Sequence, residues 1–438
     1  MTRLKPLALA FCAALILSSA RLHGQTSTSI PDTPAGTALR AWLDAYNSGD
    51  SARVAAFLHS YDVEYPLSNS FVFRQMTGGF DLLRVEVSEP RHIEFILRPR
   101  NGPGVAYGAL DVSPGEPSRV WGDLLPLGPN ASIDSLRIDT RTRARVVSRV
   151  AALLDSFYVS PEVGKQMGDS LRARLKRGAY NRNANGPGLA IRLDSDLGQI
   201  AHDKHLHLFY FPRSSEPAAG QGPAPSPEQE RRAVDENNCG FRKVEQLEGN
   251  VGYVRFDSFE EPALCESTVA AAMTFVAGTR ALIIDLRENG GGKADMVALV
   301  ASYLFDHRTH LNDFWTRHTG RTDSFWTRDS VAGRRFGGDK PVYVLTSSHT
   351  FSGAEEFAYD LQSLKRATIV GETTAGGAHP ASDSRVDDHF VLILPWGKAI
   401  NPLTGTNWEG VGVVPDVKVP ASEALTTAQR LLSEKLPH

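Results

Sequence analysis

The sequence predicts an α/β protein whose core is a mostly parallel sheet flanked by helices. Between residues 237 and 425, short apolar segments typical of buried strands alternate with segments whose apolar residues have helical spacing. Two of these strands end in a turn that opens a helix, at Asn289–Gly292 and at Ser347–Ser352. Ligands of parallel sheets gather at the carboxyl ends of the strands, so we expect the chemistry of this protein at these two turns.

The core elements are predicted from apolar runs of four to eight residues for strands and longer periodic segments for helices. The expected strands are Val251–Asp257, Ala281–Leu286, Val342–Thr346 and Ala367–Gly371, and the expected helices are Leu264–Ala277, a segment from the glycine turn to Leu304, and Ser352–Leu364.

Further units precede this core. Residues 29–127 are predicted to form a small α+β domain, because two helices joined at Asn47–Asp50 are followed by alternating strands. This order resembles the small cone-shaped folds of the nuclear-transport-factor-like group, which implies a binding or interaction module. Residues 134–211 are expected to be helical and to end in a strand at His205–Phe211. Residues 212–236 are poor in apolar side chains, which indicates a flexible linker.

The first 24 residues have the pattern of a secretory signal peptide. Arg3 and Lys5 precede an apolar run from Leu7 to Ser19, and small residues follow at the cleavage position. We therefore expect a periplasmic or secreted protein. No later stretch has the roughly 20 apolar residues of a membrane span.

The composition limits the classes of binding partner and cofactor that we expect for this protein. The chain has 438 residues, is 41% hydrophobic and 22% charged, and carries a formal net charge of -3. These values are typical of a globular protein, and no Lys/Arg-rich run favours nucleic acid. Cys239 and Cys265 remain after removal of the leader, and export would permit a disulfide between them; the sequence leaves open whether it forms. Neither Cys has metal-ligand spacing, so we expect no metal and no cofactor.

Ser352 is the candidate nucleophile. It follows a buried strand and a turn, and it opens a helix, where free backbone N–H groups and the positive end of the helix dipole favour an anionic transition state. Gly353 follows, so a substrate could approach its N–H closely. Ser352 also fits an ordinary N-cap, because Glu355 stands three positions later as in a capping box.

The segment Asp285–Gly292 ends a second strand in three successive glycines. An N–H group near Gly291 could join Gly353 in an oxyanion hole. No phosphate-loop lysine pattern follows, which argues against a nucleotide site.

Three segments together resemble the tail-specific, or C-terminal processing, serine peptidases, a family that includes the tricorn core and the interphotoreceptor retinoid-binding repeats. The resemblance implies a crotonase-like peptidase core and a serine-type endopeptidase acting on peptides or unfolded proteins. The interval at 212–236 is too short for the PDZ domain that many of these proteins carry. The segments are DLRENGGG at Asp285–Gly292, TSSHTFSGAEEF at Thr346–Phe357 with its continuation to Gly377, and NWEGVGVVPDVKV at Asn407–Val419.

The family resemblance implies a base for Ser352, but the Ser–Lys version of the family does not fit. The turn at Glu372–Ala378 has no Lys, and Lys365 is expected near the far end of the Ser352 helix. Lys293 follows the glycine turn, where geometry leaves it open as a base, but it matches no family position. The tricorn-like version takes a His from an Asp-x-His-Leu segment, which corresponds to His205 here. The rival bases are His207, which shares a strand face with His205, and also His349 and His379.

The orienting acid implied by the resemblance is Glu409, ahead of Gly-Val-x-Pro-Asp. We expect Asp416 to end a strand or cap a turn, and Asp285 and Arg287 to form a structural pair around the glycine turn. Two alternatives stay open: a non-catalytic protein that binds apolar ligands on the same fold, and a hydrolase of other acyl substrates. The sequence does not indicate an oligomeric state.

Overall fold

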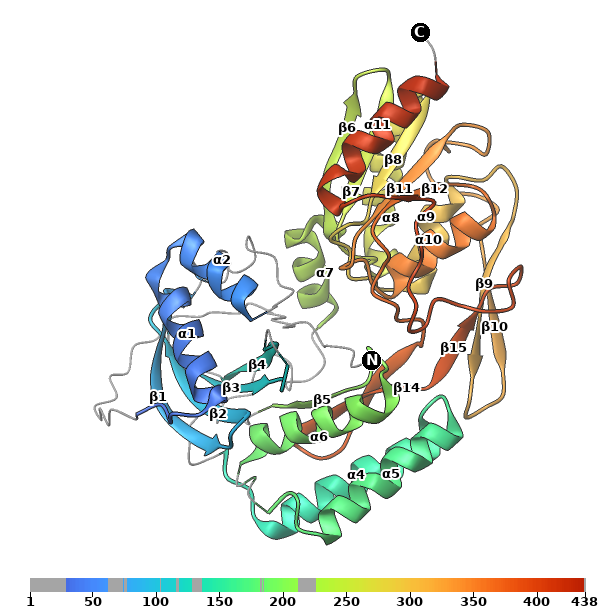
Figure 1. Ribbon diagram of the computed structural model, residues 1–438. Coiled ribbons are helices and arrows are strands. Elements are labelled where there is room, and N and C mark those ends of the chain that lie inside the picture. Colours follow the sequence, from blue (N-terminus) through green and yellow to red (C-terminus); the bar gives the residue numbers. More distant parts are fainter. Residues whose placement is uncertain are drawn as a thin grey trace.

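The computed structural model describes residues 29–61, 74, 77–102, 104–115, 118–127, 136–181, 183, 185–211 and 226–436. Three units follow one another along the chain: a small domain drawn in blue, a helical unit in green, and a core in yellow to red (Figure 1). The expected leader, residues 1–24, lies outside the described residues.

The first unit is α+β, as expected from the sequence. Helices α1 (Pro34–Ser48) and α2 (Ser51–Ser60) meet at Asp50, whose carboxylate accepts the Ala52 N–H at 2.8 Å and caps α2. A four-stranded antiparallel sheet in the order β1-β2-β3-β4 packs against α1. Its strands are β1 (Phe80–Ser88), β2 (His92–Pro99), β3 (Val105–Val112) and β4 (Val120–Leu127).

The second unit consists of three helices with side-chain N-caps. Asp139, Ser160 and Asn185 each accept a backbone N–H from the first turn that follows. The apolar faces of these helices share one core with strand β5 and its neighbour β14. The bounds are α4 (Thr140–Phe157), α5 (Pro161–Lys176), α6 (Gly186–Ala201), β5 (His207–Tyr210) and β14 (Phe390–Pro395).

The third unit is built on a six-stranded sheet in the order β16-β12-β11-β8-β7-β6. All neighbouring pairs are parallel except the antiparallel pair β6–β7, which confirms the predicted mostly parallel core. The strands are β6 (Phe241–Leu247), β7 (Val251–Phe256), β8 (Ala281–Asp285), β11 (Val342–Thr346), β12 (Thr368–Gly371) and β16 (Val417–Lys418).

Helices cover both faces of this sheet. Alternate residues of β8 point to opposite sides: Leu282 and Ile284 pack with the helices α8, α9 and α10, while Ala281 and Ile283 pack with α11 (Figure 1). The helices are α8 (Pro262–Val276), α9 (Ala294–Ser302), α10 (Gly353–Ser363) and α11 (Ala424–Lys435).

Two smaller antiparallel sheets extend from the core; of their strands, sequence analysis predicted only the one at His205–Phe211, which corresponds to β5. One has the order β10-β9-β15, and the other has the order β13-β14-β5. In the second sheet, β5 of the helical unit pairs with β14 of the core, which fixes the two units to each other. The remaining strands are β9 (His310–Thr316), β10 (Thr322–Trp326), β13 (Ala381–Arg385) and β15 (Gly397–Ile400).

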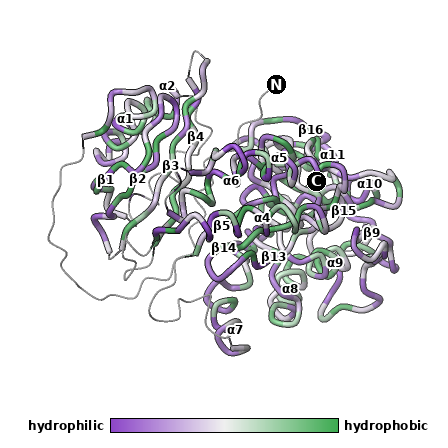
Figure 2. The backbone as a smooth tube through the Cα atoms, turned by 90° about the horizontal axis from the view of Figure 1, so that it is seen from below, coloured by the Kyte–Doolittle hydropathy of each residue, from purple (hydrophilic) through white to green (hydrophobic). Residues whose placement is uncertain are grey.

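The predicted linker 212–236 requires a correction, because its last ten residues form helix α7 (Pro227–Glu236). Ser226 caps this helix with Gln229 in a capping box, and Pro227 occupies the first turn, where a missing N–H costs nothing. The helix is strongly hydrophilic (Figure 2), which explains why its composition resembled that of a linker.

A disulfide joins Cys239, beside β6, to the buried Cys265 of α8. It closes a loop with a sequence separation of 26 residues across one edge of the core sheet. In the described part of the chain, no helix combines the length and the apolar character needed to cross a membrane.

We predict that replacing Cys239 and Cys265 together with Ser lowers the free energy of unfolding by about 3 kcal/mol, because the unfolded chain loses its cross-link. Urea unfolding of the mature protein without reductant measures this loss. Reductant should lower the stability of the parent protein to that of the double variant and leave the variant unchanged. Two thiols that alkylate in the unreduced, denatured parent protein would contradict the prediction.

Candidate active site

Ser352 lies in a sharp turn between β11 and α10. Its backbone has φ 55° and ψ -119°, a conformation that non-glycine residues rarely adopt. Such a conformation costs on the order of 1–3 kcal/mol and persists only where neighbouring contacts enforce it. The turn holds the side chain at the carboxyl end of the parallel strand β11, as the sequence predicted.

Glu355 supplies the enforcing contacts. Its fully buried carboxylate accepts hydrogen bonds from the Ser352 N–H at 2.9 Å, the Gly376 N–H at 2.6 Å, the Gly377 N–H at 2.8 Å and the Thr374 hydroxyl at 2.5 Å. Burial raises the pKa of Glu355 to about 6, and the four donors, which favour the ionised form, limit the rise. One carboxylate therefore joins the serine turn to the turn that follows β12.

His205 is the histidine that contacts Ser352. Its Nε2 lies 3.0 Å from Ser352 Oγ, although the two residues are 147 positions apart in the chain. The imidazole stacks on the Phe351 ring, with centroids 4.5 Å apart. Gly377 borders the same ring so closely that a β-carbon there would lie 2.8 Å from His205 Cε1. The ring is thus packed between the serine turn and the glycine turn.

The environment of His205 favours the neutral imidazole. Burial lowers its pKa to about 4; the charge of Asp203 opposes this shift, and the charges of His379 and His207 add to it. At neutral pH the ring is therefore uncharged and can accept a proton through Nε2. A base with so low a pKa needs negative charge nearby when it becomes an imidazolium.

The second ring nitrogen of His205 and the predicted acid Glu409 do not meet. His205 Nδ1 is buried and has no hydrogen-bond partner among the described residues. Glu409 Oε2 instead accepts the Ala378 N–H at 2.6 Å and lies 3.6 Å from His379 Nδ1. The expected contact between Glu409 and the base is absent from the described residues in this conformation.

Asp203, His379 and Glu409 form an ion-pair network behind His205. Asp203 is 4% exposed and accepts the His205 backbone N–H at 3.0 Å, the Tyr158 hydroxyl at 3.0 Å and His379 Nδ1 at 2.8 Å. The ligand atoms of the three residues lie within 4.8 Å of one another, a spacing that metal centres also show. Hydrogen bonding between the groups, as between His379 Nδ1 and Asp203 at 2.8 Å, also brings polar atoms this close.

Within this network, Asp203 and His379 support each other's ionisation, whereas Asp203 opposes ionisation of Glu409. Burial opposes charge on all three groups, but the Asp203–His379 bond raises the pKa of His379 and lowers that of Asp203. Burial and the charge of Asp203 raise the pKa of Glu409, which His379 partly offsets.

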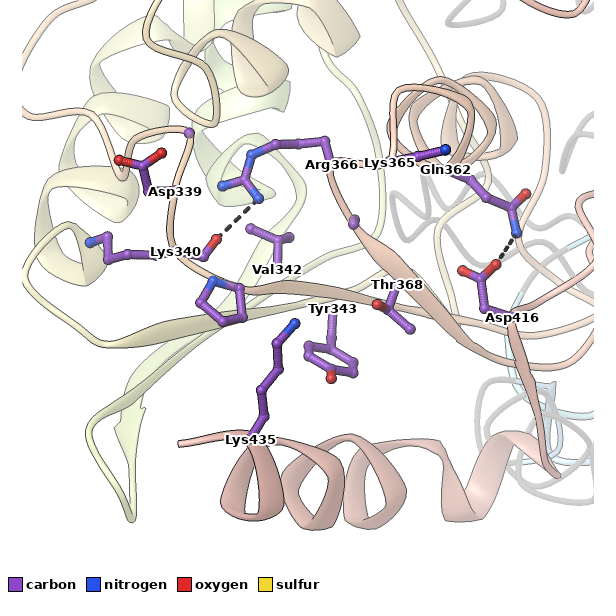
Figure 3. Close-up of a pocket in the computed structure, with 13 residues that line it drawn as sticks. Asp339, Lys340, Val342, Tyr343, Gln362, Lys365, Arg366, Thr368, Asp416 and Lys435 are labelled. Atoms are coloured by element: carbon purple, nitrogen blue, oxygen red, sulfur yellow. Dashed lines mark hydrogen bonds between the residues drawn. The ribbon is translucent and has the colours of Figure 1, made fainter. Parts of the chain in front are cut away.

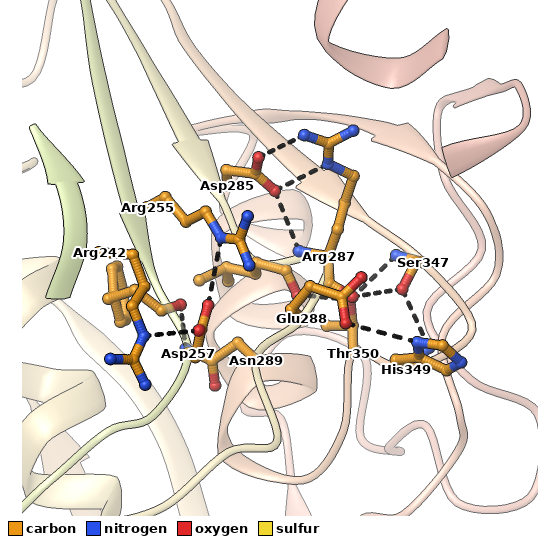
Figure 4. A network of polar contacts seen from close by, with 12 residues as sticks. Arg242, Arg255, Asp257, Asp285, Arg287, Glu288, Asn289, Ser347, His349 and Thr350 are labelled. Carbon is orange, nitrogen blue, oxygen red and sulfur yellow. Dashed lines mark hydrogen bonds and ion pairs between the residues drawn. The ribbon is translucent and has the colours of Figure 1, made fainter. Parts of the chain in front are cut away.

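The rival histidines have other partners. His207 Nδ1 lies 3.3 Å from Asp194, and its Nε2 lies 3.1 Å from the Lys204 carbonyl. His349 Nδ1 lies 3.7 Å from Glu288, and that contact raises the pKa of His349 (Figure 4). His379 bonds to Asp203, as described above.

The glycine turn after β8 lies against the serine turn. A β-carbon on Gly291 would be 2.7 Å from the Gly353 nitrogen, so only glycine fits there. The Gly291 N–H, which we expected to point at an oxyanion, donates to Asn289 Oδ1 at 2.8 Å. The Gly292 nitrogen also borders Gly353, 3.1 Å from where a β-carbon of Gly353 would lie.

A polar network holds the two turns together, as Figure 4 shows. Arg287 pairs with Asp285 at 2.6 Å, in the structural role that the sequence indicated. Thr350 donates to the Leu286 carbonyl at 2.8 Å, and the Phe351 N–H donates to the Asn289 carbonyl at 3.1 Å. Asp416 accepts the Ile369 N–H at the start of β12 and directly precedes β16, so its role is structural but it does not end a strand as we expected.

A separate pocket lies at the amino ends of β11 and β12, opposite the serine turn (Figure 3). Its Arg366 donates to the backbone carbonyls of Leu304, Gly337 and Lys340, and Lys340 donates to those of Ala277 and Thr279. These hydrogen bonds give Arg366 and Lys340 a structural role, and the pocket is remote from Ser352.

Comparison with known proteins places the site in a family. The profile of peptidase family S41 matches residues 250–419, and the profile of the N-terminal domain of peptidase S41 in eukaryotic IRBP matches residues 131–237.

Residues 250–419 of the chain form a peptidase family S41 domain.

Relatives of this chain include a carboxy-terminal-processing protease of Bartonella bacilliformis, 27% identical over 40% of this chain and 40% of the relative. A carboxyl-terminal-processing protease of Synechocystis is 32% identical over 29% of this chain and 28% of the relative. The chain thus spans less than half the length of these relatives. The solved photosystem II D1 C-terminal processing protease is 16% identical, with 67% of this chain and 98% of that chain covered and a TM-score of 0.43.

Sequence reasoning missed Asp203 and His379 as a pair, because 176 residues separate them. The Asp-x-His pattern that pointed to His205 contains Asp203, so a signal for this carboxylate was present. Nothing local to His379 indicates its partner.

Helix α10 also carries a buried carboxyl pair one turn beyond Ser352. Glu356 and Asp360 are 3% and 1% exposed and receive amide donors from Asn312 at 3.5 Å and Asn401 at 3.1 Å. Asp360 Oδ2 has no partner among the described residues. Burial raises the pKa of Glu356 to about 8, and burial with the charge of Glu356 raises that of Asp360 well above its usual value.

We predict that Gly377→Ala lowers the rate of labelling by a small fluorophosphonate about 100-fold, because the added methyl displaces the His205 ring. Gly278→Ala is the matched control, since a β-carbon at Gly278 would meet nothing within 4 Å. Equal labelling of the two variants would contradict the packing described for His205.

We also predict that stability falls as pH rises through the range in which the buried pair ionises. A neutral carboxyl favoured in the folded state stabilises the protein fully below the unfolded pKa of about 4.5, and this contribution is lost as pH approaches the folded pKa of about 8. Glu356→Gln should therefore melt roughly 2–6 °C above the parent protein at pH 9 and show a smaller loss of melting temperature from pH 5 to 9.

Glu434→Gln, at an exposed position of α11, serves as the control and should follow the parent profile at every pH. A Glu356→Gln profile parallel to that of the parent protein would show that Glu356 is already ionised in the folded state.

Proposed function

We propose that this chain is an exported serine peptidase that hydrolyses peptide bonds through Ser352 and an acyl-enzyme. One observation carries the proposal: a strained serine at the end of a parallel strand lies 3.0 Å from a half-buried histidine, and desolvation lowers the pKa of that histidine to about 4. A plain N-cap needs neither the strain nor the histidine. The relatives named as processing proteases support peptides as the substrate class.

In the proposed reaction, Ser352 Oγ attacks the peptide carbonyl carbon while His205 Nε2 takes the hydroxyl proton. The tetrahedral intermediate collapses, the C–N bond breaks, and the same proton passes to the leaving amine. Water, deprotonated by His205, then attacks the ester carbonyl carbon, the bond to Ser352 Oγ breaks, and the proton on His205 returns to Ser352 Oγ. The Gly353 N–H, at the first turn of α10, is the proposed oxyanion donor, because the helix dipole and close approach both favour negative charge there. The Gly291 N–H could join it only by leaving Asn289.

Glu409 is the proposed acid of a Ser–His–Glu triad. In that role its carboxylate would accept a hydrogen bond from His205 Nδ1, which is buried and lacks a partner among the described residues. Glu409 would have to leave His379, 3.6 Å away, to do so. The unpartnered Nδ1 supports a rearrangement on substrate binding.

Export is proposed from the signal-peptide pattern of residues 1–24 and is supported by the Cys239–Cys265 disulfide, which persists in oxidising compartments. A periplasmic or secreted location follows from this reasoning.

The proposal is tested by labelling the mature protein with a fluorophosphonate and by cleavage of an unstructured, internally quenched peptide. We expect labelling to vanish in Ser352→Ala and to fall at least about 1,000-fold in His205→Ala, with peptide cleavage lost in both. His207→Ala, whose ring contacts Asp194, should retain both activities.

A protein that only binds apolar ligands would neither label nor cleave. A hydrolase of other acyl substrates would label but leave peptides intact. Labelling that survives in His205→Ala would show that another residue acts as the base.

A further inference from the structure

We propose that Asp203 is a positioning residue for the base: it fixes the backbone of His205 and supplies the negative charge that stabilises the protonated ring, while His379 counterbalances that charge. The inference rests on the proposed function and deepens it, because the sequence assigned no role to Asp203 and considered His379 only as a rival base.

The first step concerns geometry. Asp203 Oδ1 accepts the His205 backbone N–H at 3.0 Å, so the carboxylate sets the position from which the imidazole reaches Ser352. Its other oxygen is anchored by the Tyr158 hydroxyl at 3.0 Å and by His379 at 2.8 Å. Because three donors from separate segments hold the Asp203 carboxylate, it cannot move with any one of these segments. Asp203 therefore restrains the position of the His205 backbone.

The second step concerns charge. Asp203 is 4% exposed, so water screens its charge poorly and the charge acts strongly on the half-buried ring of His205 beside it. Asp203 favours protonation of His205, whereas His379 and His207 oppose it. Glu409 contacts His379 and does not contact His205 among the described residues, so in this conformation Asp203 is the carboxylate that acts on the base.

The third step concerns His379. It bridges Asp203 at 2.8 Å and Glu409 at 3.6 Å, and a positive His379 neutralises part of the charge that the base would otherwise feel. Removing Asp203 and removing His379 should therefore shift the pKa of His205 in opposite directions. A structural defect would not produce opposite shifts.

The test is a titration of His205 in the mature protein, followed by the ¹³Cε1–H resonance of labelled histidine and assigned with His205→Ala. Asp203→Asn keeps the shape of the side chain and removes its charge. We expect the His205 pKa to fall by about one unit in Asp203→Asn and to rise by about one unit in His379→Asn, with fluorophosphonate labelling at pH 7 reduced about 10- to 100-fold in Asp203→Asn.

Asp194→Asn is the matched control, because Asp194 also accepts a backbone N–H, from Leu208 at 3.0 Å, and a histidine Nδ1, from His207 at 3.3 Å. Its labelling rate should stay within about threefold of the parent rate. Tyr158→Phe removes one hydrogen-bond donor to Asp203 and no charge. It should therefore move the His205 pKa less than Asp203→Asn does.

An unchanged His205 titration in Asp203→Asn, or shifts of the same sign in Asp203→Asn and His379→Asn, would overturn the inference. A parent protein that does not label would instead refute the proposed peptidase, and the titration would still decide the role of Asp203.

Discussion

The buried carboxylate of Glu355 is the constraint on which the candidate site depends. Its oxygens receive donors from the serine turn and from the turn after β12, which are separate segments of chain. A single desolvated carboxylate with several donors binds them strongly, and it leaves no room for either turn to move alone. The strained backbone of Ser352 persists because it could relax only if both turns changed conformation together.

The hydrogen bonds of Glu355 also help to position the proposed base, His205. Gly377 donates its N–H to Glu355, and Gly377 in turn borders both the His205 ring and the Phe351 ring on which His205 stacks. The helical unit delivers His205 to this place through β5, which pairs with β14 of the core. The nucleophile and the base therefore come from different units, and the pairing of two strands sets their separation.

Local sequence was sufficient for the parts of the fold that local physics decides. Buried strands such as β8 and β11 carry continuous apolar runs, and helix caps such as Asp50 and Asn185 follow known preferences. Ser352 and its glycine turns were visible because tight turns demand particular residues. The strands β9, β10, β13 and β15 were missed. Half-exposed antiparallel strands have a weak alternation of apolar and polar residues, and their formation depends on the strands with which they pair.

The polar network around the base could not be predicted in the same way. Glu355 could be assigned as a capping residue, but its bonds to Gly376 and Gly377 span more than 20 residues. The expected pairing of Glu409 with His205 came from family resemblance, and in this conformation Glu409 meets His379 instead. Contacts between residues so far apart in the chain depend on how the sheets are assembled, which no single segment encodes.

The most direct measurement is the position of the covalent adduct after inactivation of the folded mature protein with a fluorophosphonate, mapped by peptide mass spectrometry. Activation of Ser352 by the turn and by His205 predicts one adduct per chain, on the peptide that begins α10 and at Ser352 itself, with Ser347 and Ser348 unmodified. An adduct on another serine, or a folded protein that remains unmodified, would contradict the assignment of Ser352 as the nucleophile.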